Sequence, residues 1–337
     1  MRNEERESFA VGGQAVIEGV MMRGRDYVAC AVRNPAGEIT LKKEPFHSIL
    51  GRLRLKKAPV LRGAIGLVET MYLGMRILGY SAEIAMPEAE EKKRRKRGGV
   101  MERFGLGLTM LVAFVLGLGL FFYLPLLLTG WVPGTEGAFA FNLVDGAFRL
   151  VIFLLYIWAI SLLKDMRRVF QYHGAEHKTI NCYESGGMLT PEEILRHTRF
   201  HPRCGTSFLL LVMVVSILVF IPLGRPDNVG ERLLRLAMVF PIGGISYELI
   251  KLSVKPRIRR YMAPIIYPGL WLQRLTTREP DRDQCEVALK ALAACLDPEE
   301  LAARTPARDY DFSPPPVHYE EEVYEEESRN LKEAGGE

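Results

Sequence analysis

Apolar residues gather along this chain in four long runs separated by charged connections. A membrane-spanning helix needs roughly 20 mostly apolar residues. The runs that approach this length are Leu106 to Thr129, Ala147 to Leu163, Ser207 to Leu223 and Leu233 to Leu252. We therefore predict an α-helical integral membrane protein with about four transmembrane helices. The last run is the weakest, because it contains Arg235, Glu248 and Lys251.

Lysine and arginine indicate the orientation, because these residues gather at the cytoplasmic ends of spanning helices. Six consecutive basic residues, Lys92 to Arg97, precede the first run, whereas the loop Gly130 to Asn142 contains none. Basic residues return between the second and third runs and again after the fourth. We therefore expect a multi-pass protein with both termini and the central connection in the cytoplasm. Arg225, Arg232 and Arg235 depart from this pattern.

A further apolar stretch, Val60 to Met86, carries charges at a regular interval. Arg62, Glu69, Arg76 and Glu83 are seven residues apart, which places them on one stripe of a helix. We predict an amphipathic helix that lies in the membrane interface or against the bundle with this stripe toward water. The alternative is an ordinary helix of a soluble core.

The two ends of the chain have the patterns of soluble segments. Tyr27 to Arg33 and Glu38 to Lys43 are β-type runs joined by the turn residues Asn34 to Gly37, so a small N-terminal β-hairpin is expected. Asp283 to Leu296 has apolar residues at helical spacing. The proline- and glutamate-rich tail beyond residue 304 lacks the apolar content to fold alone.

Composition agrees with a membrane protein that has substantial soluble parts. Charged residues make up 25% of the 337 residues, which excludes a chain that is mostly membrane span, such as a twelve-helix carrier. The net charge of +4 combines a basic body with an acidic tail. Five cysteines is an odd number, and no signal peptide precedes the soluble N-terminus, so reduced cytoplasmic thiols are expected.

Four of the six histidines lie within the central connection, and two of them form the sharpest motif of the chain. His173, Glu176 and His177 match H-x-x-E-H, the inverted zincin signature. On a helix, two histidines four residues apart share one face and can bind one Zn²⁺ ion, while the adjacent glutamate can activate a water. His201 and Cys204 add an imidazole and a thiol in the same connection.

These residues allow two kinds of metal site. A closed structural zinc site would use His173, His177, His201 and Cys204 as its four ligands. An open catalytic site would use three protein ligands with Glu176 as the base. Glu248 is a candidate third ligand, because an acidic residue within a span is costly unless it is paired or liganded. The remaining alternative is that the histidines only form hydrogen bonds in a polar loop.

Two other motifs have weaker interpretations. The glycine-containing segment Gly12 to Gly24 lacks the spacing of a phosphate-binding loop. It either brings Gln14, Glu18 and Arg23 to a site at the membrane face or packs tightly against the bundle. The run Lys92 to Arg97 is expected to contact anionic lipids and to hold the span end in the cytoplasm. No aromatic residues interleave with these charges, which argues against nucleic acid as a partner.

Four strings of the sequence resemble the YqhQ family of uncharacterised bacterial membrane proteins. They are GGQAVIEGVMMRG from Gly12, HGAEHKTINCYESG from His173, HPRCGTSF from His201 and QRLTTREP from Gln273. The family is described as predicted metal-dependent enzymes because of its histidines. The resemblance implies a location in the bacterial inner membrane and extends this proposal to His173, Glu176 and His177, with His201 and Cys204 as further candidates.

The expected organisation follows from these patterns. The segments are an N-terminal cytoplasmic segment with a hairpin (1–58), an amphipathic helix (59–86), a basic linker (87–103), spans one and two (104–163), a cytoplasmic His-rich loop (164–206), spans three and four (207–252), a cytoplasmic C-terminal segment with a helix (253–304) and a disordered acidic tail (305–337).

The leading functional prediction is a zinc-dependent hydrolase at the cytoplasmic membrane face. Its substrate would be a membrane-bound peptide or a lipid-linked compound. A non-enzymatic scaffold that binds membrane-protein partners and holds a structural zinc is the first alternative. A transporter is the second, because Pro241, Gly243 and Gly244 interrupt the span that carries Glu248.

Overall fold

An antiparallel sheet of four strands forms the N-terminal part of the computed structural model, which describes residues 11–46, 48, 58–87, 99–253 and 256–305. The strands are β1 (Gly12–Val16), β2 (Gly19–Arg23), β3 (Tyr27–Arg33) and β4 (Ile39–Pro45), paired in the order β1-β2-β3-β4. The expected hairpin is confirmed as β3 and β4. The glycine-containing segment before it forms another hairpin, β1 and β2, which is the first hairpin along the chain.

The turn of the first hairpin places an acidic residue in an unusual backbone conformation. Val16 pairs with Gly19, so only Ile17 and Glu18 form the turn. Glu18 has φ 53°, a left-handed value that is uncommon for residues other than glycine. Its carboxylate forms an ion pair with Arg168 and accepts a hydrogen bond from the Tyr172 hydroxyl at 3.3 Å. These contacts attach the hairpin to the helix that carries the histidine motif.

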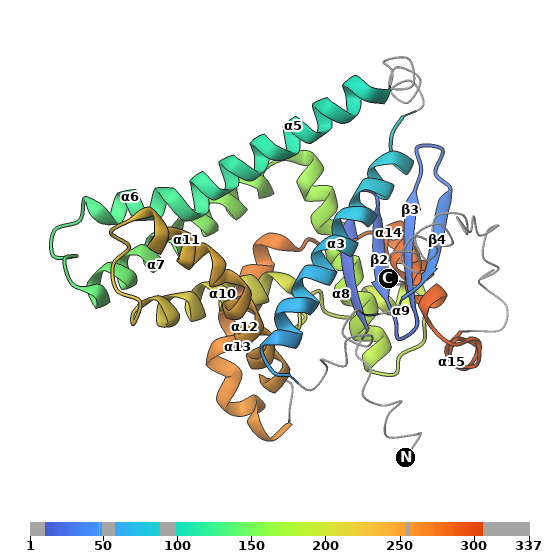
Figure 1. Cartoon of the computed structure of the whole chain (residues 1–337). Coiled ribbons are helices and arrows are strands. Elements are labelled where there is room, and N and C mark those ends of the chain that lie inside the picture. Colours follow the sequence, from blue (N-terminus) through green and yellow to red (C-terminus); the bar gives the residue numbers. More distant parts are fainter. Residues whose placement is uncertain (1–10, 47, 49–57, 88–98, 254–255, 306–337) are drawn as a thin grey trace, which may run out of the picture.

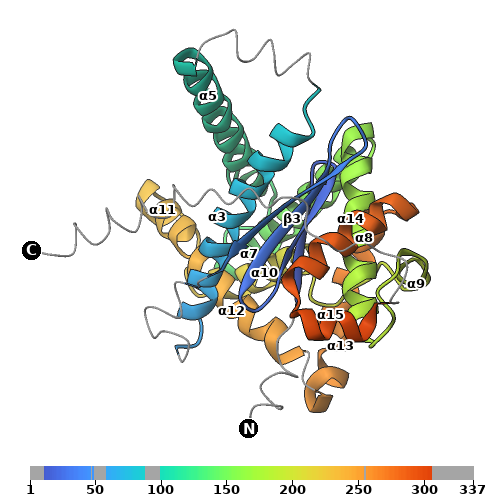
Figure 2. The same cartoon turned by 90° about the vertical axis from the view of Figure 1, so that its right-hand side faces the viewer.

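Both faces of the sheet are covered, which gives a three-layer arrangement (Figures 1 and 2). One face packs against α8 (Lys164–Glu184) and α14 (Arg282–Cys295) through a core that includes Met22, Tyr172 and Leu292. The opposite face packs against α3 (Leu61–Ile84) through Met21 and Leu73. Alternate residues of β2 and β3 supply the two cores, as the period of two in a strand requires.

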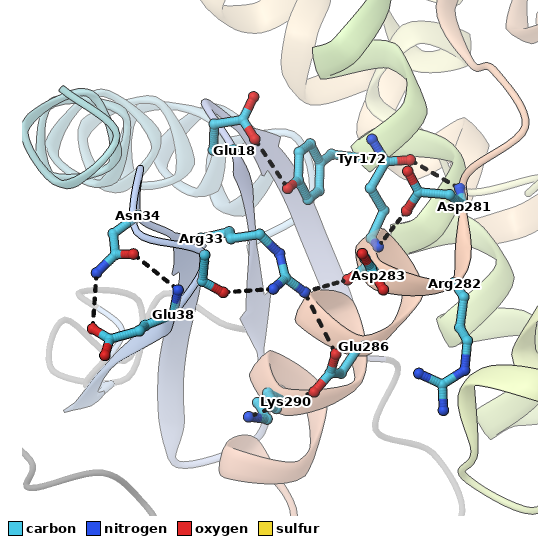
Figure 3. A network of polar contacts seen from close by, with 12 residues as sticks. Glu18, Arg33, Asn34, Glu38, Tyr172, Asp281, Arg282, Asp283, Glu286 and Lys290 are labelled. Atoms are coloured by element: carbon cyan, nitrogen blue, oxygen red, sulfur yellow. Dashed lines mark hydrogen bonds and ion pairs between the residues drawn. The ribbon is translucent and has the colours of Figure 1, made fainter. Parts of the chain in front are cut away.

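Polar contacts fasten the far end of the sheet to α14 (Figure 3). Arg33, at the end of β3, donates hydrogen bonds to the main-chain oxygen of Asp283 at 3.1 Å and to Glu286 at 3.4 Å. The turn that follows is closed by the Asn34 side-chain oxygen, which accepts from the Glu38 N–H at 2.9 Å. Residues 250 positions apart are thereby joined. The sheet and α14 therefore form one packed unit.

Most of the remaining helices build a bundle beside this unit (Figure 1). They are α5 (Gly99–Leu118), a π-helical turn (Gly119–Tyr123), α6 (Leu124–Gly130), α7 (Ala138–Ser161), α10 (Gly205–Phe220), α11 (Val229–Ala237), α12 (Val239–Ser253) and α13 (Pro256–Thr276). Three helical stretches are long and apolar enough to cross a membrane: Leu111–Gly130, Ala138–Ser161 and Val229–Ser253. Many of their apolar side chains are exposed, as the 65% exposure of Phe114 illustrates.

The third predicted run forms a shorter helix than expected. Helix α10 has 16 residues, whereas a spanning helix needs roughly 20. It packs against the bundle with one side, where Leu210 lies in a cluster with Phe153 of α7 and Leu211 lies in a cluster with Ile242 of α12. The structure therefore bears out a mostly helical chain with three candidate spans and a small N-terminal sheet.

The amphipathic helix is present as α3, but the predicted orientation of its charged stripe is wrong. Arg62 forms an ion pair with Glu248 of α12, and Arg76 forms one with Glu44 of β4. Arg62 and Arg76 therefore pair with groups of the protein, and the apolar side of the helix faces outward. That side carries Val68, Met71, Tyr72, Met75 and Leu78, which are between 42% and 61% exposed.

The connection predicted as a His-rich loop is largely helical. It contains α8 and the short helix α9 (Pro191–Arg196), whose N-cap Thr190 accepts a hydrogen bond from the Glu193 N–H. The predicted C-terminal helix is confirmed as α14, and α15 (Pro298–Arg304) follows it. The basic run Lys92 to Arg97 and the tail from residue 306 lie outside the described residues.

Candidate metal centre

One face of α8 carries the H-x-x-E-H motif. His173, Glu176, His177 and Ile180 follow the spacing i, i+3, i+4 and i+7, which brings them to the same side of a helix. All four line a cavity of about 340 Å³ between α8, β1 and the N-terminal end of α10. The opposite side of α8 is anchored in the sheet core by Tyr172 and Ala175. This anchoring fixes the position of the face of α8 that carries the motif.

Three potential metal ligands meet in this cavity. One ligand atom each from His173, His177 and Cys204 lies within 4.8 Å of the others. The Cys204 sulfur is 3.3 Å from Nε2 of His173 and also interacts with His177. The two imidazole centroids are 4.4 Å apart. Cys204 is the residue directly before α10, so the cluster joins α8 to the beginning of that helix.

Both imidazoles are oriented by main-chain carbonyls. Nδ1 of His173 donates to the oxygen of Thr276 at 2.8 Å, and Nδ1 of His177 donates to the oxygen of Arg199 at 2.7 Å. A carbonyl only accepts, so Nδ1 carries the proton and Nε2 keeps its lone pair for a ligand. Metal-binding histidines are usually held in this way. Burial also lowers the pKa of His177 below 6.5, which favours the neutral, ligand-competent form.

The segment 273–278, at the C-terminal end of α13, holds the elements that carry the cluster. The Gln273 side chain accepts from the His201 N–H at 2.8 Å and donates to the His201 carbonyl at 2.7 Å and to the Ser207 hydroxyl at 3.0 Å. A β-carbon on Gly174 would lie 2.0 Å from the Arg278 carbonyl oxygen, so only glycine permits this close approach to α8. The segment thereby fixes both the helix and the connection that carries Cys204.

Glu176 lies beside the ligands and is covered by β1. Only 5% of Glu176 is exposed, and its side chain fills the space that a side chain on Gly13 would need. Burial raises the pKa of this carboxyl above 4.5, while the nearby imidazoles of His173 and His201 and the backbone of Ala15 act in the opposite direction. A carboxyl with a raised pKa next to potential metal ligands is suited to proton transfer.

The structure does not bring all the predicted ligands together. His201 lines the same cavity, but its Nε2 is 3.5 Å from a carboxylate oxygen of Glu184, and it is outside the group of three. Its ring centroid is 5.7 Å from that of His177. Glu248 forms the ion pair with Arg62 of α3 and is not among the residues that line the cavity. Its charge is balanced there without a metal ion.

The three donors fit a zinc ion in chemical type. Two neutral imidazoles and one thiol are ligands that Zn²⁺ prefers, and three protein ligands with one open position are typical of catalytic zinc sites. The cavity provides space beside the cluster, and Glu176 lies at that space. Within the described residues, this is the one cluster of at least three such side chains close enough to share a metal ion.

Sequence reasoning missed the groups that support the cluster. Gln273 contacts His201, which lies 72 positions earlier, and Thr276 contacts His173, which lies 103 positions earlier. No local sequence pattern reveals such contacts. The glycine pair Gly12 and Gly13 was noted, but its contact with Glu176 depends on β1 lying over α8. The string QRLTTREP was a usable signal, since it has several hydrogen-bonding residues at the end of an apolar helix.

Comparison with known proteins yields two matches. The family model described as "Protein of unknown function (DUF1385)" matches residues 58–298. A protein of Bacillus subtilis (strain 168) described as "Uncharacterized protein YqhQ" is 35% identical over 303 residues, covering 87% of this chain and 94% of that protein. No solved structure matches the chain.

Proposed function

The chain belongs to the DUF1385 family, and from the geometry of the α8 cluster we propose that it is a zinc-dependent hydrolase acting at the cytoplasmic face of a bacterial membrane. The observation that carries this proposal is the meeting of His173, His177 and Cys204 within 4.8 Å in a cavity that also contains Glu176. The resemblance of four sequence strings to the YqhQ family, which implies a metal-dependent enzyme, is in line with this proposal.

Each residue of the site has a defined role in this proposal. His173, His177 and Cys204 hold Zn²⁺, which when bound supplies Lewis-acid polarisation of a substrate carbonyl. Glu176 accepts a proton from the attacking water. The water oxygen bonds to the carbonyl carbon, the bond from that carbon to the leaving group breaks, and Glu176 returns the proton to the leaving group. The carbonyls of Thr276 and Arg199 keep the imidazoles aligned throughout.

The membrane arrangement belongs to the same proposal. The three candidate spans and the shorter α10 together make four crossings, with both termini, α8 and the sheet in the cytoplasm. The outward apolar side of α3 lies against lipid, and the basic run Lys92 to Arg97 contacts anionic headgroups. Placed in this way, the cavity faces the cytoplasm just beyond the bilayer, because α8 begins three residues after α7 ends.

A structural zinc site in a non-enzymatic scaffold is the second candidate function. The observation in its favour is that His201, only 4% exposed, lines the same cavity and is near enough for a modest shift to make it a fourth ligand. A closed site of this kind would stabilise the fold without leaving a position for substrate.

Metal content measured beside complementation of a deletion strain separates the two candidates. For a hydrolase, Glu176→Gln retains zinc and abolishes function, whereas His177→Ala and Cys204→Ala lose both. For a structural site, Glu176→Gln is nearly silent, whereas His201→Ala releases zinc together with the other two ligand variants. Wild-type protein that binds no transition metal at stoichiometric amounts, when purified from zinc-supplied cells without chelator, contradicts both candidates.

A further inference from the structure

The strand nearest to the metal ligands has an unpaired edge. In the order β1-β2-β3-β4, β1 is an outer strand, and within the described part of the chain no strand pairs with its other side. The cavity that contains the ligands also runs along this strand and is lined by the consecutive residues from Val11 to Ala15. An unpaired strand edge is a template for another extended chain.

The register of the hairpin determines which backbone groups face the cavity. Val16 and Gly19 close a two-residue turn, and such a closing pair exchanges hydrogen bonds within the hairpin. The pattern alternates, so Gln14 and Gly12 also bond toward β2, while Ala15 and Gly13 direct their N–H and C=O groups away from it. The contact between Glu176 and the backbone of Ala15 agrees with this assignment.

Resting on the hydrolase proposal, we infer that the substrate is a polypeptide that binds in extended conformation by pairing with β1 as an additional strand. A strand edge offers one donor and one acceptor about every 7 Å, a repeat that matches an extended peptide backbone. Val169 and Leu209, which also line the cavity, provide apolar contact for the side chains of such a peptide.

The reaction on this substrate is hydrolysis of a peptide bond. The water oxygen bonds to the peptide carbonyl carbon, the C–N bond breaks, and the proton taken by Glu176 moves to the departing nitrogen. The products are a carboxylic acid and an amine, and no oxidant or further reactant is needed. Pairing with β1 holds the scissile carbonyl beside Glu176, because the contact of Glu176 with Gly13 and Ala15 places its carboxyl at the same strand edge.

Peptide hydroxamates test the inference separately from the zinc site. The probe is an N-acetylated tetrapeptide hydroxamate of alternating alanine and leucine, and the reference is acetohydroxamate, which has no strand to pair. Binding of each is measured by calorimetry to the zinc-loaded full-length protein in lipid nanodiscs. The tetrapeptide should bind at least roughly tenfold more tightly, since each added backbone hydrogen bond contributes modestly but cumulatively.

Methylation of the peptide nitrogens supplies a signature specific to strand pairing. Only every second N–H of the bound peptide faces β1. Methylation of those nitrogens should remove the gain in affinity, whereas methylation of the intervening nitrogens should leave the affinity within about threefold of that of the unmethylated tetrapeptide. Equal binding of the tetrapeptide and acetohydroxamate, or equal sensitivity at all nitrogens, would overturn the inference while leaving the zinc site intact. Failure of acetohydroxamate to bind a zinc-loaded protein contradicts the hydrolase proposal itself.

Discussion

Gly13 lies so close to Glu176 that a β-carbon added to the glycine would sit 2.7 Å from Cγ of the glutamate. This distance is far below normal contact, and Glu176 has little freedom because it is buried between α8 and β1. Glu176, the proposed base, can therefore occupy its position only because residue 13 of β1 has no side chain.

The first prediction follows from this contact. Gly13→Ala should displace the Glu176 carboxyl and lower turnover by roughly 10²-fold, as misplacement of a catalytic group by about 1 Å can do. Zinc content should stay at the wild-type level, because Gly13 is not a ligand. Gly12→Ala is the matched control, since no atom lies within 4 Å of a β-carbon at that position. Equal activity of both variants would show that Glu176 is not held by β1.

Gln273 provides a test of the supporting layer. Gln273→Ala should lower the free energy of unfolding by about 1–3 kcal/mol, because it leaves the buried N–H of His201 without its partner. Zinc affinity should fall by roughly 10- to 100-fold, which is the usual effect of removing a hydrogen-bonding residue that orients a metal site. Thermal unfolding and competitive zinc titration measure the two effects. Arg274→Ala, one residue along the same helix, is the control.

The two buried imidazoles predict that the metal-free protein loses stability as the pH falls below 6.5. Burial lowers the pKa of His177 and of His201 below 6.5, so below that pH the unfolded chain binds protons that the folded chain excludes. Their contribution to stability is complete above pH 6.5 and is lost as the pH falls below it. The drop in unfolding temperature between pH 7 and pH 5 should be smaller in His201→Gln than in the wild type. An identical drop in both would contradict the pKa direction.

The cysteines should differ in reactivity toward alkylating reagents. Burial raises the pKa of Cys30 and Cys285 to about 12 and that of Cys182 and Cys295 to about 11, so these thiols remain protonated at pH 8. Cys204 lines the cavity. Iodoacetamide should therefore label Cys204 first, and zinc should protect it. Mass spectrometry of the native protein locates the label; faster labelling of any other cysteine would be inconsistent with this cavity.

Reporter fusions test the proposed topology. A reporter after Gly186 or Glu300 should be cytoplasmic, whereas one after Gly134 should lie outside, because most of the basic residues beside the spans lie at their proposed inner ends and the loop Gly130 to Asn142 has none. Fusions after these residues avoid the apolar helices. An external reporter at Gly186 would place α8 and the histidines in the wrong compartment and exclude the four-crossing arrangement.

Local periodicity predicted the helices but not which of their faces would be buried. The interval of seven placed Arg62 and Arg76 on one stripe correctly, yet it gives no information about the stripe's partners, which come from α12 and β4. Glu248 was predicted as a candidate third ligand because an acidic residue within a span is costly unless it is paired or liganded. Its observed partner, Arg62, lies 186 residues earlier in the chain. In both cases the missing information was a long-range ion pair.

The first hairpin was missed for a different reason. β2 is buried on both faces, by α8 and α14 on one side and by α3 on the other. Such a strand shows no alternation of polar and apolar residues. The string GGQAVIEGVMMRG was therefore interpreted as a site at the membrane face or as tight packing against the bundle, and not as a pair of strands. The H-x-x-E-H motif, in contrast, was readable because its three residues belong to one helix and need no distant element to share a face.

The core that joins the sheet to α8 and α14 is assembled from segments that leave the ribosome at very different times. Strands β1 to β4 are made first, but Val287, Leu289 and Leu292, which cover them, are made only after every apolar helix of the bundle. The carbonyl of Thr276 that orients His173 is equally late. The cavity beside α8 can therefore close only after the chain has been made as far as Leu292, so a chain that stalls before this residue has no assembled cavity.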